Sequence, residues 1–454
     1  MTLNLTSLPA DTQERCLDVF AVHPKPEQLE VVAAMARGED CILIAGCGWG
    51  KSLVYFLPLV LWPNKVILLL SPLKALAEEQ QQKLEKLQIR SIALTGESEI
   101  GLPLLQDLAC GLYRAVFLSP ELIFSGERIG RLWHMHSWRE RLLAVVVDEA
   151  HCISTWGGDF RKDYGRIGDL RAMVPKTVAF LALSATLPPA TLATVRRSLH
   201  FEPGARIINV GNDRPNIKYV VSNLQHPLNS YQDLKFLLDF RKTIVYFQGR
   251  PEAEAARKFL VQLLDDPSDS SKIAVYHSVK SDDFKREVLE GFRVDRIRLL
   301  LATEAVGMGC DINDIVRVVQ YGLPSSISSL IQRLGRAARD PGLQGLGLLL
   351  VPRTLASRRR PVNEKKDPEL TQYIETKDCR RRVLNNIFGN EHRNIANCCD
   401  ICHPEPQAIV EIDEEERDGN LLKAASARVP SLTAEEKDVA RQAIRAWRLA
   451  LFER

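Results

Sequence analysis

The stretch Ala45-Gly46-Cys47-Gly48-Trp49-Gly50-Lys51-Ser52 decides how the chain folds. It follows the apolar run Cys41–Ala45 and precedes a helical pattern, so it predicts a glycine-rich turn between a strand and a helix. Glycines let backbone N–H groups approach phosphate oxygens, and the helix N-terminus adds positive potential. Lys51 would then reach the β- and γ-phosphates of ATP, and the Ser52 hydroxyl would hold Mg²⁺. The loop glycines expected at the nucleotide are Gly46, Gly48 and Gly50.

Short apolar runs alternate with helical patterns from residue 41 to about residue 351. Their hydrophobicity is continuous, which is typical of strands covered on both faces and hence of parallel sheets between helices. One sheet containing every run would be very wide, so an α/β fold with two sheets is favoured. The first set is Cys41–Ala45, Val66–Leu70, Ala115–Leu118, Leu142–Val147 and Val178–Leu183. The second set is Thr243–Phe247, Ile273–Tyr276, Ile297–Leu301, Ile315–Val319 and Leu346–Val351.

The breaker-rich stretch Gly211–Asn216 separates the two sets and reads as a linker. We therefore expect one α/β lobe at residues 1–210 and a second at residues 211–352. Residues 353–405 contain a basic run, a predicted helix at Pro368–Phe388 and clustered cysteines. Residues 406–454 are expected to form an acidic linker and a C-terminal helix, which runs to Arg454 without a capping residue. That uncapped end suggests a chain cut from a longer one.

The composition is that of an ordinary globular protein. Of the 454 residues, 45% are hydrophobic and 26% are charged, which excludes the wholly disordered, collagen and coiled-coil classes. The chain has 60 Lys and Arg against 57 Asp and Glu. No apolar run approaches the ~20 residues of a membrane span, and the N-terminus does not resemble a secretory signal. Most of the 10 cysteines are scattered, which favours a reducing compartment. We expect an intracellular protein, not secreted and not bound to membranes: nuclear in a eukaryote or cytoplasmic in a bacterium.

Two further stretches have the residue types that hydrolysis of ATP requires. Asp148-Glu149-Ala150-His151 follows a buried strand, where α/β sheets bind their ligands. Asp148 is expected to hold Mg²⁺, and Glu149 to orient and deprotonate the attacking water; a solvated acidic loop is the alternative. Arg336 and Arg339 are three residues apart and are predicted to share one face of a helix. They could stabilise charge on the γ-phosphate from the second lobe, although arginines at this spacing usually form a solvated surface.

Together these stretches resemble the RecQ family of superfamily 2 helicases, over a region from about Phe20 to Cys402. The Cys152-Ile153-Ser154 continuation and the residues Trp156-Gly157 and Asp159-Phe160-Arg161 separate this family from other branches. The remaining matches are Gln28, Gly48–Ser52, Ser71-Pro72-Leu73, Asp148–His151, Ser184-Ala185-Thr186, Ala302–Gly309 and Gln332–Asp340.

The resemblance implies two RecA-like parallel-sheet lobes followed by a small helical zinc-binding subdomain. It also implies a 3′→5′ DNA helicase that couples ATP hydrolysis to translocation on single-stranded DNA and to duplex unwinding in repair or recombination. Gln28 falls where the family reads adenine, and Asp311 where superfamily 2 proteins contact the ribose. Ser184 and Thr186 fall at the motif that couples hydrolysis to strand movement.

The loop Ser154–Tyr164 matches the aromatic-rich loop with which the family senses single-stranded DNA. Trp156 and Phe160 offer π faces to bases, and Arg161 offers phosphate or cation–π contacts. Packing of the two aromatic rings beneath a loop is the alternative. Gly158 departs from the usual His, which puts the coupling of DNA sensing to hydrolysis in doubt, and Ala338 replaces the usual Gly.

The cysteines near residue 400 suggest a Zn²⁺ site. Cys379 resembles the first ligand of the family's zinc-binding subdomain, and Cys399 and Cys402 have a spacing that suits tetrahedral thiolate coordination. The fourth ligand is expected to be Cys398, with His392 or His403 as alternatives. Buried free cysteines around an apolar helix would be the non-metal interpretation.

The partner expected from the resemblance is single-stranded and partly duplex DNA, whereas protein partners are not indicated. No winged-helix module is evident after Cys402, so unwinding could be modest. Two other functions stay open: an RNA helicase, since Asp-Glu-Ala-His also occurs there, and a nucleotide-gated DNA-binding or scaffold protein with weak or lost unwinding.

Overall fold

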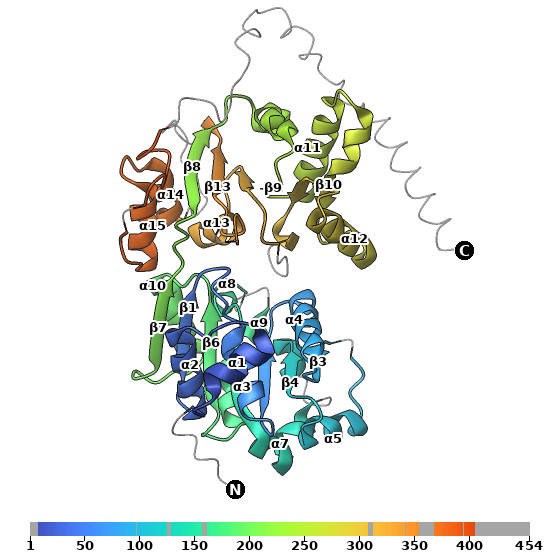
Figure 1. The fold of residues 1–454 in the computed structure, drawn as a ribbon, viewed down its shortest axis with the longest axis vertical. Coiled ribbons are helices and arrows are strands. Elements are labelled where there is room, and N and C mark those ends of the chain that lie inside the picture. The colour runs from blue at the N-terminus through green and yellow to red at the C-terminus, as the bar shows by residue number, and fades with distance from the viewer. Residues whose placement is uncertain are drawn as a thin grey trace, which may run out of the picture. The chain divides into compact units, whose positions relative to one another are not determined.

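The computed structural model describes residues 8–96, 98–124, 129–156, 161–306, 312–340, 342–353, 367–393 and 395–404, without the side chains of residues 155 and 156. These residues belong to one compact unit. Its two parallel sheets and the surrounding helices are shown in Figure 1. The predicted linker and helix at residues 406–454 lie outside the described residues.

Lobe 1 is built on a sheet of 7 parallel strands in the order β3-β4-β2-β5-β6-β1-β7. The predicted runs form its central strands, with β6 starting one residue later than expected. Its two edge strands, β3 and β7, were not predicted, because part of each faces solvent and neither is a continuous apolar run. The strands are β1 (Cys41–Ala45), β2 (Val66–Leu70), β3 (Ser91–Leu94), β4 (Ala115–Leu118), β5 (Leu142–Val147), β6 (Ala179–Ser184) and β7 (Arg206–Gly211).

Lobe 2 is built on a sheet of 6 parallel strands in the order β10-β11-β9-β12-β13-β8. Strands β11 and β12 each begin two residues later than predicted, and β8, which directly follows the linker, was not predicted. The strands are β8 (Ile217–Asn223), β9 (Thr243–Tyr246), β10 (Ile273–Tyr276), β11 (Leu299–Ala302), β12 (Arg317–Tyr321) and β13 (Gly345–Val351).

Helices connect successive strands in both lobes, as parallel pairing requires. The lobe 1 helices are α1 (Thr12–Phe20), α2 (Pro26–Ala36), α3 (Leu53–Leu61), α4 (Lys74–Lys86), α5 (Leu102–Cys110), α6 (Pro120–Ile123), α7 (His136–Arg141), α8 (Cys152–Trp156), α9 (Lys162–Gly165) and α10 (Pro189–Ser198). The later helices are α11 (Arg250–Gln262), α12 (Asp282–Arg293), α13 (Ile327–Leu334), α14 (Pro368–Glu375) and α15 (Arg380–Phe388). Among the described residues, no helix has the length and apolar character needed to cross a bilayer.

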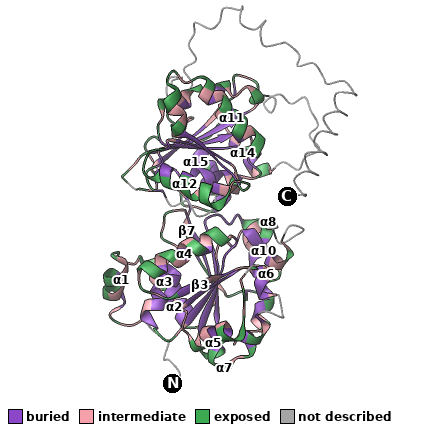
Figure 2. Ribbon diagram, turned by 90° about the vertical axis from the view of Figure 1, so that its right-hand side faces the viewer, coloured by how far each residue is buried: buried purple, intermediate pink, exposed green. Residues whose placement is uncertain are grey.

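Both faces of the lobe 1 sheet are buried, which confirms the interpretation of the continuous apolar runs (Figure 2). Alternate residues of β1 enter different cores: Ile42 and Ile44 pack in one cluster, whereas Cys41 and Leu43 pack in another. Two hydrophobic cores therefore fix the register of β1, and the loop that follows it starts from a rigid strand end.

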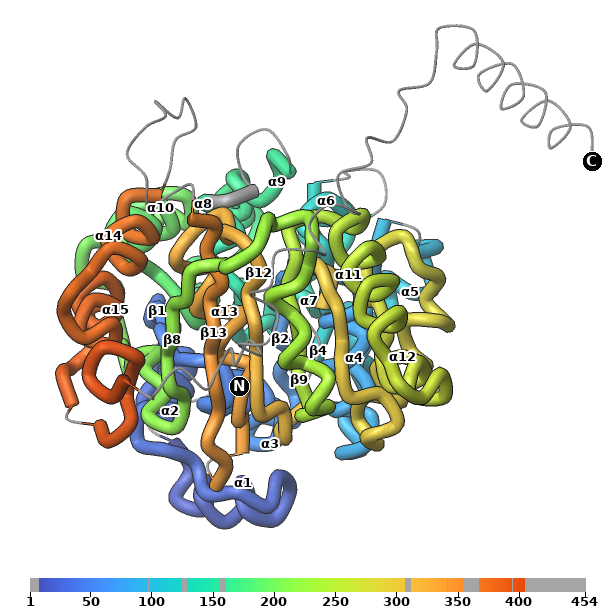
Figure 3. Tube along the Cα trace, turned by 90° about the horizontal axis from the view of Figure 1, so that it is seen from above, coloured from blue at the N-terminus to red at the C-terminus, as the bar shows by residue number. Residues whose placement is uncertain are grey.

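The segment with α14 and α15 packs on lobe 2 and shares its hydrophobic core. Tyr373, Leu384 and Cys399 belong to the same buried cluster as the strands of that lobe. Cys399 also forms a parallel bridge with Tyr219, so the chain lies beside β8, with α14 and α15 nearby (Figure 3). The segment thus extends lobe 2 and does not have a separate core.

The single helix predicted at Pro368–Phe388 is wrong, because the structure has two helices with a break between them. Thr376 ends α14 with an extended backbone, and Cys379 begins α15 as its N-cap. The break places the Cys379 side chain at the start of α15, where it faces the other cysteines.

The shared core leads to a stability prediction. Leu384 has only 4% of its surface exposed, and Leu384→Ala is expected to lower the free energy of unfolding by about 2–5 kcal/mol. Arg382→Ala, on the exposed face of the same helix, should change it by less than about 0.5 kcal/mol. Denaturant titration followed by tryptophan fluorescence measures both variants. Equal effects would show that α15 does not contribute to the core.

Candidate functional site

The phosphate loop lies between β1 and α3, as predicted. Gly48 and Gly50 have φ angles of 80° and 96°, a conformation that disfavours residues with a Cβ. Nζ of Lys51 donates to the carbonyl oxygens of Ala45 at 2.9 Å and Gly46 at 3.3 Å, so the lysine lies within the loop. Ser52 is the N-cap of α3 but makes no capping hydrogen bond through its side chain. The loop thus has the backbone geometry and cation that phosphate binding requires.

Gln28 is buried in the first turn of α2 and is tied to the phosphate loop. Its Nε2 donates to the carbonyl of Gly50 at 3.0 Å, and its Oε1 accepts from the backbone N–H of Lys25 at 2.7 Å. The amide therefore supports the loop from the side of α2. Its contact with adenine stays a prediction.

Asp148 and Glu149 follow β5, on the same edge of the sheet as the phosphate loop. The backbone N–H of Glu149 donates to Oδ1 of Asp148 at 2.9 Å, and Glu149 has a φ angle of 48°. Burial, together with the neighbouring Glu149, raises the pKa of Asp148 to about 6. A buried carboxylate of this kind favours a bound cation, so the donor set of Ser52 and Asp148 fits Mg²⁺.

Glu149 stays ionised although it is buried. Burial alone would raise its pKa, but the hydrogen bond and charge of His151 outweigh burial and lower the pKa to about 2. The charges of Lys51 and Arg336 act in the same direction. Because the carboxylate keeps its negative charge at neutral pH, it can accept a proton or orient a water molecule.

His151 connects the carboxylates to the predicted coupling residues. Its Nδ1 lies 3.1 Å from Oγ of Ser184 and 3.3 Å from Oε2 of Glu149. Burial disfavours the charged imidazolium, yet hydrogen bonds with Cys152 and Glu149 raise the pKa of His151 to about 10. Oγ of Ser184 in turn accepts from the backbone N–H of Thr186 at 3.2 Å. Ser184 is therefore linked to Glu149 through His151, and Thr186 is linked to His151 through Ser184.

A side chain of lobe 2 also reaches His151. Nε2 of Gln332, in α13, lies 3.2 Å from Nε2 of His151. Neither residue was assigned a role from the sequence, although both stand inside motifs that were recognised. Their positions inside those motifs could have identified them as candidate site residues.

Arg336 and Arg339 do not lie on a helix, so the prediction of a shared helical face is wrong. The helix α13 ends at Leu334, and both arginines follow in a turn. Ala338, between them, has a φ angle of 44°, and its N–H donates to the carbonyl of Ile315 at 2.6 Å. The left-handed backbone explains why glycine would suit this position, and alanine there is strained.

Part of the predicted DNA-sensing loop and the predicted ribose contact lie outside the described residues. Phe160 and Asp311 lie outside the described residues, and Trp156 is described only as the last residue of α8. Arg161 donates to Oε1 of Glu121 at 2.5 Å and to the carbonyl of Pro72 at 2.6 Å, and its guanidinium lies over the ring of Tyr164. Its charge is thus partly balanced within lobe 1, and its contact with DNA stays a prediction.

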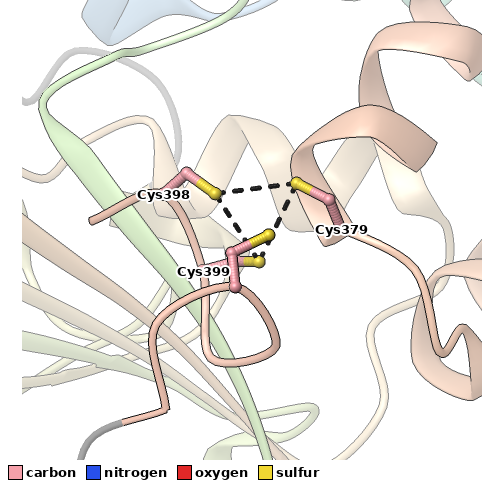
Figure 4. Close-up of side chains that lie close together, drawn as sticks. Cys379, Cys398 and Cys399 are labelled. Atoms are coloured by element: carbon pink, nitrogen blue, oxygen red, sulfur yellow. Dashed lines mark hydrogen bonds between the residues drawn. The ribbon is translucent and has the colours of Figure 1, made fainter. Parts of the chain in front are cut away.

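The four cysteines of the predicted zinc site lie together. Their sulfur atoms lie within 4.8 Å of one another, and the members are Cys379, Cys398, Cys399 and Cys402. The distances between Sγ atoms are 3.6 Å for Cys379 and Cys398, 3.8 Å for Cys398 and Cys399, and 3.9 Å for Cys399 and Cys379 (Figure 4). Tetrahedral Zn²⁺ with Zn–S bonds of about 2.3 Å requires sulfur atoms about 3.8 Å apart, so the residues fit Zn²⁺.

Cys398 is the fourth member, as expected, and the cluster contains no histidine. Nε2 of His392 instead lies 3.0 Å from Oδ1 of Asn386. Asn397, just before the adjacent pair, has a φ angle of 57°, which turns the chain so that consecutive thiols reach one point. Burial would raise the pKa of Cys399, but backbone N–H groups around it lower that pKa and favour the thiolate.

Comparisons with known sequences agree with this arrangement. The model described as DEAD/DEAH box helicase matches residues 25–195, and Helicase conserved C-terminal domain matches residues 229–341. The model described as RecQ zinc-binding matches residues 350–403, which contain the four clustered cysteines. The chain belongs to the RecQ helicase family.

Several RecQ proteins are similar along most of this chain. "ATP-dependent DNA helicase RecQ" of Haemophilus influenzae is 28% identical over 84% of this chain and 61% of the relative. "RecQ-like DNA helicase blm-1" of Caenorhabditis elegans is 30% identical over 83% of this chain and 40% of the relative. The chain therefore spans less than two thirds of the length of these curated relatives.

Solved structures share the two-lobed fold. The DUF1998 helicase MrfA bound to DNA has a TM-score of 0.61 at 21% identity, covering 76% of this chain and 51% of that chain. Dbp5 of S. cerevisiae bound to RNA and ADP BeF3 has a TM-score of 0.60 at 16% identity, covering 85% of this chain and 93% of that chain. At these identities the likeness concerns the fold alone.

The cysteine cluster predicts the metal content of the purified protein. We expect one Zn²⁺ per chain by inductively coupled plasma mass spectrometry, and Cys398→Ser should weaken retention by about tenfold or more against a chelator, because a ligand is lost. Cys110→Ser is the matched control, since Cys110 is a free, exposed cysteine of α5. Wild-type protein without zinc, or equal zinc retention in both variants, would contradict the assignment.

Proposed function

We propose that the chain is an ATP- and Mg²⁺-dependent DNA helicase that moves 3′→5′ on single-stranded DNA and unwinds duplexes in repair or recombination. Family membership supports hydrolysis of ATP and an action on DNA, since the curated relatives are named ATP-dependent DNA helicases. Polarity and the preference for single-stranded or partly duplex DNA rest on the resemblance to the family. An intracellular location, nuclear in a eukaryote or cytoplasmic in a bacterium, belongs to the same proposal.

The observation that carries the proposal is the His151 network at the carboxyl ends of the lobe 1 strands. Through it, the candidate base Glu149 is in contact with the motif of Ser184 and with α13 of lobe 2. A change in any of these groups therefore alters the surroundings of the others. Such a link is what coupling of hydrolysis to lobe movement requires.

Each residue of the site has a separate proposed role in the hydrolysis of ATP. Lys51 would balance charge on the β- and γ-phosphates, and Glu149 would orient water and accept its proton. Bound Mg²⁺ would supply further positive charge at the phosphate oxygens. Arg336 lies close enough to lower the pKa of Glu149, so its charge can also act on the transferred phosphoryl group.

The assignment of the active site predicts strong and selective losses of turnover. Lys51→Ala and Glu149→Gln should each lower the kcat of ATP hydrolysis by about 100-fold or more, because a charge or a base is removed from the transition state. Lys176→Ala and Glu140→Gln, at exposed positions of lobe 1, should retain normal kcat. A phosphate-release assay with saturating single-stranded DNA measures all four variants. A normal kcat in Lys51→Ala would contradict the assignment of the active site.

A strand-displacement assay tests the proposed function itself. DNA duplexes with a 3′ tail should be separated in the presence of ATP and Mg²⁺, whereas duplexes with a 5′ tail should not. Preference for tailed RNA duplexes would identify an RNA helicase. ATPase activity that DNA stimulates without strand separation would favour the nucleotide-gated DNA-binding protein. ATPase activity unchanged by DNA would contradict the helicase and translocase functions together.

A further inference from the structure

The linker between the lobes runs directly against the phosphate loop. The backbone N–H of Gly46 donates to the carbonyl of Gly211 at 2.9 Å. A Cβ on Gly46 would lie 3.1 Å from Cα of Asn212, so even a methyl group there would crowd the linker. The position of the linker is therefore set by the same loop that is expected to bind phosphate.

Arg214 of the linker joins this loop to lobe 2. Its Nη1 donates to the carbonyl of Cys47 in the phosphate loop at 3.2 Å and to that of Gly335 at 3.0 Å. Its Nη2 donates to the carbonyls of Ala337 at 3.3 Å and of Ala338. One guanidinium thus contacts the phosphate loop and the turn that carries Arg336 and Arg339.

The turn itself depends on linker side chains. Ala338 has a strained, left-handed backbone, and its carbonyl accepts from Arg214 and, at 2.8 Å, from Nδ2 of Asn216. Nδ2 of Asn216 also donates to the carbonyl of Leu343 at 2.9 Å. Strained backbone persists only where its surroundings hold it, so loss of these donors should let the turn relax.

The helix α15 holds the linker from the other side. The guanidinium of Arg381 is buried, pairs with the carboxylate of Asp213, and donates to the carbonyls of Arg214 at 2.9 Å and Ile217 at 2.6 Å. Nδ2 of Asn390, just after α15, donates to Oδ1 of Asn212 at 2.7 Å. Arg381 and Asn390 belong to the zinc-binding segment, which comprises α14, α15 and the four clustered cysteines at residues 367–404. This segment is thereby bonded to the residues on both sides of Arg214.

We propose that Arg214 is a positioning residue that fixes Arg336 and Arg339 relative to the phosphate loop, and that Arg381 anchors it from the zinc-binding segment. The inference rests on the proposed function, since the reaction affected is hydrolysis of ATP. The donors of Arg214 bind backbone carbonyls of the two elements that must meet, the phosphate loop and the turn after α13. Burial disfavours the charged guanidinium and so lowers the pKa of Arg214. The backbone carbonyls that accept from it on both elements offset this destabilisation.

The first test separates positioning from general stability. Arg214→Ala should lower kcat by about 10- to 100-fold and leave the dissociation constant for a fluorescent ATP analogue within about threefold, because misplaced charge weakens the transition state more than binding. Arg114→Ala is the matched control: its guanidinium also donates to carbonyls, of Leu59, Trp62 and Lys65, but all within lobe 1. An equal loss of kcat in both variants would overturn the proposal.

Combined variants test whether Arg214 acts through Arg336 and Arg339. If it does, adding Arg214→Ala to a variant with both Arg336→Ala and Arg339→Ala should slow hydrolysis no further, since the groups to be positioned are already absent. A further loss that multiplies with the first would show that Arg214 acts independently of the two arginines and would overturn the proposal. The variants with and without Arg214→Ala are assayed at saturating ATP and single-stranded DNA.

Hydrogen exchange gives a readout that does not require activity. In nucleotide-free protein, Arg214→Ala should speed amide exchange at least threefold in peptides covering residues 45–52 and 331–343, whereas Arg114→Ala should not. Wild-type protein that fails to hydrolyse ATP would refute the proposed function but leave this comparison valid. Unchanged exchange in Arg214→Ala would refute the positioning role even in an active helicase.

The anchor is tested in the zinc-binding segment. Arg381→Ala should lower kcat by about tenfold while it retains the zinc content of wild-type protein, because the cysteines keep their positions. Arg382→Ala, exposed on the same helix, should leave kcat unchanged. Loss of zinc and kcat together would show that Arg381 acts by maintaining the metal site, and unchanged kcat would show that it does not anchor Arg214; either result overturns this part of the proposal.

Discussion

Parallel pairing of the lobe 1 strands is the constraint on which the rest of the structure depends. In a parallel sheet all carboxyl ends meet at one edge, so the loops after β1, β5 and β6 converge without being adjacent in sequence. Those loops contain the glycines of the phosphate loop, the two carboxylates and the motif of Ser184 and Thr186. Hydrophobic burial on both faces of the sheet fixes the strand ends, and the polar chemistry is built on rigid supports.

The charges of the polar groups at that edge compensate one another. Two buried carboxylates stand side by side, and their repulsion is relieved because His151 is positively charged and Lys51 and Arg336 lie near. Since Arg336 comes from lobe 2, its contribution to lowering the pKa of Glu149 depends on how closely that lobe approaches. Electrostatics and lobe position are therefore linked at the residue proposed to activate water.

Sequence patterns predicted the parts of the fold that are buried on both faces, and failed where tertiary contacts decide the conformation. Strand β7 was missed because its exposed residues interrupt the apolar run. The arginine motif has good helix formers, yet the helix ends before Arg336 because distant donors such as Arg214 hold a turn there. The composition of the linker predicted a turn, but it did not indicate that Arg214 joins the phosphate loop to the turn that carries Arg336 and Arg339. For the zinc site, spacing left the fourth ligand open, and proximity in space identified Cys398.

The adjacent pair of cysteines has a consequence for how such sites vary between related chains. Along an extended strand, neighbouring side chains point to opposite faces, so two consecutive thiols can reach one metal only if the chain bends at them. The left-handed backbone of Asn397 provides part of that bend. Asparagine, aspartate and glycine tolerate this conformation far better than other residues. In related chains where two metal ligands are adjacent, we expect the residue before them to be asparagine, aspartate or glycine. A change of ligand position therefore requires a compatible backbone as well as a new thiol.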